Sequence, residues 1–246
     1  MRRITIILTL SLFPVIVCEA QKNITHNNQQ WLQYYNQLKL SESLTLFSDA
    51  SLRRIDNFNH WQQLALRTGI GYQLFENLNG VTGFGCFESF NYNKPSKIEF
   101  RPYQELNTSQ EFGKISVQHR FRAEGRYFRT IPDGEITSNF NFRFRYRLFF
   151  KTAILKLSKT IPERKLFLNF GDELFINAGK EITYNMLDNN RMLFGLSFQV
   201  NKNLDFSFTY NYQLGQRNKP STYEHSDVFW IGITHKIAFT HNNKTN

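Results

Sequence analysis

The stretch from Lys114 to Arg129 alternates between two kinds of side chain over sixteen residues. A period of two residues predicts a β-strand with two chemically different faces. Ordinary strands run about 5–6 residues. A strand that crosses a bilayer needs about 9–11, with apolar side chains toward lipid and polar ones toward a lumen. The stretch therefore predicts a membrane-spanning strand, with a mainly apolar face (Ile115, Val117, His119, Phe121, Ala123, Gly125, Tyr127) and a mainly polar face (Ser116, Gln118, Arg120, Arg122, Glu124, Arg126, Phe128).

A second stretch, about Ser138–Leu157, repeats this pattern. We expect its outward side chains to be Phe140, Phe142, Phe144, Tyr146, Leu148 and Phe150, and its inward ones to be Asn141, Arg143, Arg145, Arg147 and Lys151. The chain is therefore predicted to be all-β, a transmembrane antiparallel β-barrel. The other alternating segments are Gln30–Leu40, Ser43–Arg53, Trp61–Leu74, Gly80–Phe90, Ile98–Leu106, Lys165–Asn177, Asn190–Val200, Leu204–Leu214 and Asp227–Phe239.

The sequence shows eleven alternating segments, whereas bacterial barrels normally have an even number of strands. We expect about 12 strands, with 10 as the alternative. Either one strand has been merged or missed, or Gln21–Gln29 adds an irregular first strand. Connections after the first, third and ninth strands are predicted to be short, with the fifth a further candidate, and those after even-numbered strands longer. Outer-membrane barrels show this asymmetry, with short periplasmic turns and longer outer loops.

The first twenty residues have the features of a secretory signal peptide: basic Arg2 and Arg3, apolar Ile4–Val17, and a small-x-small cleavage site at residues 18–20. We expect a cleaved signal peptide at 1–20, a flexible polar N-terminus at 21–29, the barrel at 30–239 and a polar tail at 240–246. The mature protein would then lie in the bacterial outer membrane. A mean hydropathy of −0.46 does not oppose this location, because a barrel hides half of each strand in a polar lumen.

Several functional classes are disfavoured by composition and motifs. A net charge of +10 could indicate nucleic-acid binding, but an exported chain rarely meets nucleic acid. Only Cys86 survives signal cleavage, so no intrachain disulfide is expected. The sequence contains no CxxC, HExxH, GxSxG or glycine-rich phosphate loop, and its six histidines are scattered. We therefore expect neither cofactor nor metal, and no enzymatic activity. The alternative is a lipid-modifying hydrolase near the rim, which His119 and His235 keep open, although Ser116 faces away from His119.

The pattern of several segments resembles that of a known family. The segments are Trp31, Glu99–Gln104, His119–Arg126, Phe142–Arg147, Asp172–Phe175, and Asn190-Arg191 before Gly195. They resemble the uncharacterised outer-membrane β-barrel family of Bacteroidota-like bacteria known as domain of unknown function twenty-four ninety. The resemblance covers nearly the whole mature chain and implies fold and location, but no activity. The final strand, ending at Phe239 with Ile231, Ile233 and Ile237 before it, also looks like a signal for the barrel-assembly machinery.

The inward faces of neighbouring strands predict a charged lumen. One hypothesis is a salt-bridged network that fills a small barrel, because buried charges must be paired or hydrated. The other is a narrow anion-favouring pore, because rings of arginine line anion pores and arginines outnumber carboxylates here. The expected partners are outer-membrane lipid, the assembly machinery and, for a pore, small anionic solutes. The predicted network comprises Glu99, Arg101, Glu105, Arg120, Arg122, Glu124, Arg126, Arg143, Arg145, Arg147 and Glu173.

Overall fold

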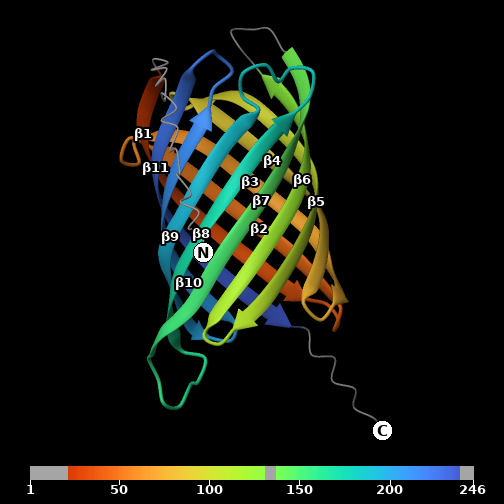
Figure 1. Cartoon of the computed structure of the whole chain (residues 1–246), viewed down its shortest axis with the longest axis vertical. Coiled ribbons are helices and arrows are strands. Elements are labelled where there is room, and N and C mark those ends of the chain that lie inside the picture. The colour runs from red at the N-terminus through yellow and green to blue at the C-terminus, as the bar shows by residue number, and fades with distance from the viewer. Residues whose placement is uncertain (1–21, 131–136, 239–246) are drawn as a thin grey trace, which may run out of the picture.

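A computed structural model describes residues 22–130 and 137–238, and these residues form a closed β-barrel (Figure 1). The expected all-β barrel is confirmed. The strands are β1 (Asn23–Lys39), β2 (Leu44–Ile55), β3 (His60–Phe75), β4 (Leu78–Asn91), β5 (Lys94–Phe112), β6 (Ile115–Thr130), β7 (Thr137–Lys156), β8 (Lys165–Ala178), β9 (Leu187–Asn201), β10 (Leu204–Gln216) and β11 (Thr222–Ala238). Within these two ranges, no helix has the length and apolar character needed to cross a membrane.

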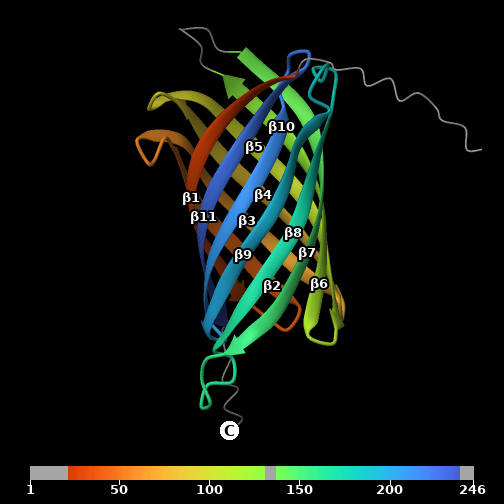
Figure 2. The same ribbon diagram turned by 60° about the vertical axis from the view of Figure 1, so that its left-hand side comes forward.

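The barrel closes through a parallel pair. Each strand pairs antiparallel with the next along the chain, but β1 and β11 run in the same direction, with Asn23 opposite Thr222 and Lys39 opposite Ala238. An odd number of up-and-down strands leaves the first and last strands parallel when they meet. Asn23 and Ala238 therefore lie at opposite ends of the barrel, which we call the Asn23 end and the Ala238 end (Figures 1 and 2).

The predicted strand number of 12, or 10, is wrong, because the described residues form eleven strands. An odd number is possible here because the first and last strands pair in parallel, and it equals the number of segments that alternate in the sequence. The segment 21–29, predicted to be flexible, is strand from Asn23 onward, because its backbone pairs with β11. The predicted signal peptide at 1–20, Phe239 and the tail at 240–246 lie outside the described residues.

The expected difference between short and long connections is only partly present. Residues 76–77, 113–114 and 202–203 make tight connections at the Ala238 end, and longer ones at 179–186 and 217–221 lie at the Asn23 end. Three connections depart from the expected asymmetry. Residues 56–59 after β2, where a longer loop was expected, are no more numerous than residues 40–43 after β1. Residues 92–93 alone follow β4, where a longer loop was expected, and the long connection 157–164 projects from the Ala238 end (Figure 1).

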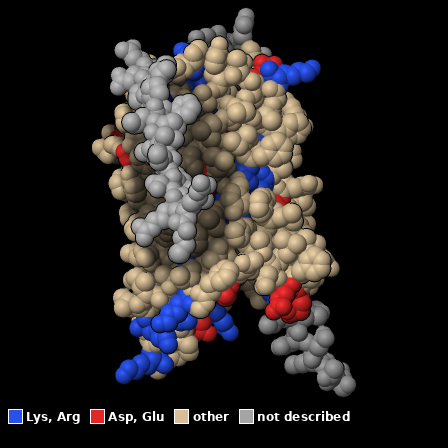
Figure 3. Space-filling model, viewed as in Figure 1, with Lys and Arg blue, Asp and Glu red and all other residues tan. Residues whose placement is uncertain are grey.

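The two faces of the wall separate as the alternation predicts. On β7, Phe142 and Phe144 are each 50% exposed, whereas Arg143 and Arg145 between and beside them are buried in the lumen. The face seen in Figure 3 is mostly uncharged, with acidic and basic side chains gathered mainly toward the two ends. Apolar side chains cover the outside because alternate positions of every strand carry them.

Glycines on β3 and β4 make room for aromatic side chains in the lumen. A Cβ at Gly69 would lie 2.7 Å from the hydroxyl of Tyr103, and one at Gly83 would overlap the same ring. A Cβ at Gly85 would lie 2.7 Å from Cε2 of Phe87. Since Tyr103 and Phe87 each stack under an arginine of the lumen, these glycines help to position the charged network.

Candidate functional site: an arginine-rich lumen

One cavity of about 1240 Å³ follows the inside of the barrel. Its lining includes Arg217 and Asn218 in the connection at the Asn23 end, and Glu76 and Asn77 in a connection at the Ala238 end. Eleven arginines and one lysine line it, against seven carboxylates. Glu124, which lies beneath these side chains and contacts three of the arginines, brings the carboxylates to eight. The lumen therefore carries an excess of four positive charges.

Glu124 on β6 is a nearly fully enclosed carboxylate, with 2% of its side chain exposed. Its Oε2 accepts hydrogen bonds from Nε and Nη2 of Arg143, at 2.8 and 2.5 Å. Its Oε1 accepts one from Nη1 of Arg145 at 2.8 Å, and Nη1 of Arg122 lies 3.6 Å away. Arg143 and Arg145 reach this carboxylate because Arg143 is paired directly opposite Glu124 and Arg145 points the same way two residues further along β7.

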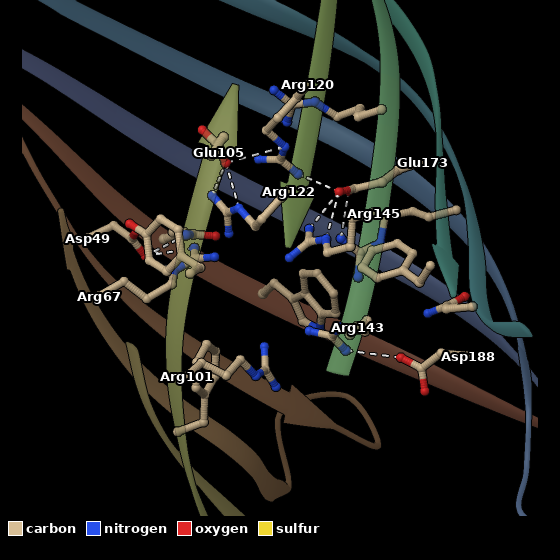
Figure 4. A pocket seen from close by; sticks show the side chains of 18 of the residues that line it. Asp49, Arg67, Arg101, Glu105, Arg120, Arg122, Arg143, Arg145, Glu173 and Asp188 are labelled. Atoms are coloured by element: carbon tan, nitrogen blue, oxygen red, sulfur yellow. Dashed lines mark hydrogen bonds and ion pairs between the residues drawn. The ribbon is translucent and has the colours of Figure 1, made fainter. Parts of the chain in front are cut away.

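Glu173 on β8 is a second carboxylate at which arginines converge, among them Arg145 and Arg120 (Figure 4). Arg145 also donates to Glu124 and so links the two carboxylates. Arg145 donates to Glu173 Oε1 from Nε at 2.9 Å and from Nη2 at 2.6 Å. Arg120 also pairs with Oε1, and Nη1 of Arg191 lies 3.5 Å from Oε2. The Arg145 guanidinium therefore bridges two buried carboxylates on different strands.

The remaining carboxylates complete the network around the wall. Glu99 pairs with Arg101 and Arg126, with closest distances of 2.5 and 2.6 Å. Glu105 pairs with Arg122 and, at 3.8 Å, with Arg120. Two further carboxylates were not among the predicted residues: Asp188, 3.0 Å from Arg143, and Asp49, 2.7 Å from Arg67.

All predicted network residues lie on the lumen side of the wall. Ten of them line the cavity, and Glu124 lies beneath. Nine of the others join the ion pairs described above, but Arg147 has no carboxylate within ion-pair distance among the described residues. The prediction missed Asp49, Arg53, Arg67, Asp188 and Arg191. Asp49 and Arg53 share one face of the alternating segment Ser43–Arg53, so the pattern could have identified them.

Aromatic rings support many of the guanidinium groups. Trp31 contacts two of them, since the guanidinium carbons of Arg53 and Arg191 lie 3.9 and 5.2 Å from its ring. Phe175 lies 4.4 Å from Arg145 and 4.7 Å from Arg191. Stacking on an aromatic face holds an arginine in place without neutralising it. The lumen therefore presents fixed positive charge rather than flexible side chains.

The histidines considered for catalysis contact tyrosines. Nδ1 of His119 lies 2.8 Å from the hydroxyl of Tyr146, and Nδ1 of His235 lies 3.1 Å from that of Tyr34. Tyr146 and Tyr34 belong to the apolar outer face, and neither histidine forms a hydrogen bond with a serine among the described residues. In the same part of the chain, no group of three or more His, Cys, Asp or Glu side chains is arranged to hold a metal ion.

The fold and lumen define a closed β-barrel protein with a positively charged interior. The chain belongs to the family described as Protein of unknown function (DUF2490), whose model matches residues 28–224. No curated protein matches the sequence significantly.

Two solved structures are similar, both mutants of the ferric enterobactin receptor PfeA from Pseudomonas aeruginosa. The G324V mutant is 10% identical over 73% of this chain, and the R480A/Q482A mutant 8% identical over 74%, each with a TM-score of 0.32. The matches cover 36% of the receptor chain, so this protein spans about a third of its length.

Proposed function

We propose that the protein is an outer-membrane β-barrel, exported with a cleaved signal peptide, whose narrow lumen admits small anions. The single observation that carries the proposal is the excess of guanidinium groups over carboxylates around a cavity lined at both ends of the barrel. Rings of arginine favour anions in pores, because the fixed charge replaces part of the hydration that the ion loses.

The salt-bridged network and the anion-favouring lumen are two properties of one arrangement. Barrels of about eight strands are filled by side chains, and those of 16–18 leave a wide aqueous channel. A barrel of eleven strands lies between these sizes. Ion-paired side chains of β5–β8 fill the lumen next to these strands, and the cavity occupies the rest. The arginines that form ion pairs narrow the lumen, and the excess of arginines over carboxylates makes its electrostatic potential positive.

The proposal places the apolar outer face against lipid and includes assembly by the outer-membrane insertion machinery. It includes no catalytic step, in keeping with the tyrosine partners of His119 and His235. Lipid release that persists through purification would support the hydrolase alternative instead.

The test is conductance of the purified protein in a planar bilayer under a potassium chloride gradient. We expect discrete steps whose reversal potential shows preference for chloride. Arg147→Glu, which reverses one unpaired charge in the lumen, should shift the reversal potential toward cations. Arg129→Glu, on an exposed position of β6, is the matched control and should not. Silence of the folded barrel, or preference for potassium, would contradict the proposal.

A further inference from the structure

Hydrogen-bond donors from four strands meet around Trp31 in the lumen, and two of them have no acceptor among the described residues. We call Trp31, Arg53, Arg191 and Trp230 the Trp31 site. Arg53 comes from β2, Arg191 from β9 and Trp230 from β11, and the rings of Trp31 and Trp230 lie 5.4 Å apart. Register explains the arrangement, since both Trp230 and Arg53 are paired directly opposite Trp31 on its two neighbouring strands.

Two of these donors are buried and have no hydrogen-bond partner among the described residues: Nε of Arg53 and Nε1 of Trp230. The indole N–H of Trp31 is satisfied, because it donates to Gln29 Oε1 at 2.9 Å. A buried donor without an acceptor costs about 1–3 kcal/mol, and more when it is charged. Two such donors beside one indole therefore indicate that an acceptor belongs there.

The electrostatic surroundings indicate that the acceptor is negative. No carboxylate of the described residues lies within ion-pair distance of Arg53, whose guanidinium shares the Trp31 ring with that of Arg191. Arg191 is itself weakly compensated, because its shortest bonds go to the neutral Gln213, at 3.1 and 3.3 Å, and Glu173 lies 3.5 Å away. Water could satisfy the donors, but an anion would also offset the repulsion between these guanidiniums.

We propose that the Trp31 site binds a small oxyanion of the phosphate or carboxylate type, held by Arg53, Trp230 and Arg191. The planar guanidinium of arginine presents a fork of N–H donors that matches two oxygens of either group. This inference rests on the proposed function, since a solute must be able to enter the lumen. The inference adds the site in the lumen at which the solute binds and the chemical groups that recognise it.

The test uses the two site tryptophans as reporters. In a Trp61→Phe background only Trp31 and Trp230 remain, since the sequence has three tryptophans. The folded barrel in detergent is titrated with pyrophosphate, with succinate, and with sodium chloride at matched ionic strength. We expect a saturable fluorescence change with pyrophosphate or succinate and none with chloride. Comparison of the apparent Kd values for pyrophosphate and succinate shows whether the site prefers a phosphate or a carboxylate ligand.

Two matched variants separate a defined site from general positive potential. Arg53→Gln should raise the apparent Kd about tenfold or more, because a charge-assisted contact is lost. Arg147→Gln removes the same charge from the lumen away from Trp31 and should raise it much less. Arg54→Gln changes the next residue, which points to the outer face and donates to Phe58 O at 3.1 Å, and should leave the Kd unchanged. Should Arg53→Gln fail to show heat-modifiable folding, Trp230→Phe replaces it, with Trp31 as reporter.

Equal weakening by Arg53→Gln and Arg147→Gln, or no saturable change in the parent barrel, would overturn the Trp31 site. These outcomes are distinct from failure of the pore. Chloride-selective conductance without saturable binding would refute the Trp31 site but support the proposed anion-favouring pore. Saturable binding sensitive to Arg53→Gln in a barrel that does not conduct leaves the site and removes the pore.

Discussion

Replacing Glu124 by glutamine should destabilise the barrel more than replacing Arg145 by glutamine. The two side chains make a matched pair, because Glu124 accepts three hydrogen bonds from arginines and Arg145 donates three to carboxylates. Both are almost fully buried, with 2% and 7% of the side chain exposed. The loss of local hydrogen bonds therefore lowers the stability of both variants by a similar amount. The remaining difference between their free energies of unfolding reports the sign of the surrounding charge.

The size of the difference follows from the charge excess in the lumen. Breaking a buried ion pair from one side costs about 3–5 kcal/mol. Glu124→Gln adds to this the repulsion among arginines that the carboxylate had offset, whereas Arg145→Gln relieves some of it. At an effective dielectric constant of about 20, two unit charges about 10 Å apart interact by about 1.7 kcal/mol. With an excess of four positive charges and water in the cavity, we expect Glu124→Gln to lower the free energy of unfolding by about 2 kcal/mol more than Arg145→Gln.

The measurement is the urea midpoint of each variant in the same detergent, followed by tryptophan fluorescence and by heat-modifiability on gels. Glu111→Gln, at an exposed position near the end of β5, controls for removing any carboxylate and should change the midpoint little. Raising sodium chloride to about 1 M shortens the screening length to about 3 Å. The difference between the urea midpoints of Glu124→Gln and Arg145→Gln should then become smaller. If Arg145→Gln proves equally or more damaging, the lumen is not net positive, and the anion-favouring proposal fails with it.

Three further expectations concern the wall and its location. Single cysteines along β7 in a Cys86→Ala background should react alternately with a water-soluble reagent, with position 145 labelled and position 144 protected; uniform labelling would exclude a membrane wall. Asp172 accepts hydrogen bonds from Asn190 at 3.0 and 3.1 Å on the outer face, beside Phe170 and Met192, which are 50% and 52% exposed. Replacing both Asp172 and Asn190 by leucine should therefore raise the free energy of unfolding in lipid vesicles, measured from the urea midpoint. The gain should be less than the cost of about 2–4 kcal/mol for a Lys or Arg at the middle of the bilayer. A lower urea midpoint would place this face outside the membrane. The mature protein should fractionate with outer membranes, and recovery as a folded soluble periplasmic protein would refute that location.

The identity and facing of the strands could be predicted because both depend on local sequence. Alternation with a period of two assigns Phe144 to one face and Arg145 to the other without any knowledge of pairing. The ends of strands were less predictable. Residues 23–29 are polar except for Ile24 and carry no clear alternation, and they are strand because β11 offers them backbone partners. The parallel closure depends on which strands meet around the barrel, which no single segment encodes.

The charged network was predictable where its members lie on adjacent strands with strong alternation, as with Glu124 and Arg143. Contacts between strands that are not neighbours escaped prediction. Asp188 on β9 lies 3.0 Å from Arg143 on β7, and Arg53 and Arg191 approach one indole from strands on different sides of β1. Such contacts depend on the curvature and shear of the closed barrel, which fix how far side chains reach across the lumen.

The parallel β1–β11 pair makes a prediction about topology in the membrane. Because Asn23 and Ala238 lie at opposite ends of the barrel, the free ends of the two terminal strands should lie on opposite sides of the outer membrane. Single cysteines at Lys22 and at Ala238 test this in a Cys86→Ala background, with a reagent that does not cross the outer membrane. In intact cells only one of the two positions should react, and both should react after the membrane is opened. An even-stranded barrel would place both termini on one side, so equal labelling of both positions in intact cells would show that the parallel closure, and with it the eleven-stranded barrel, is wrong.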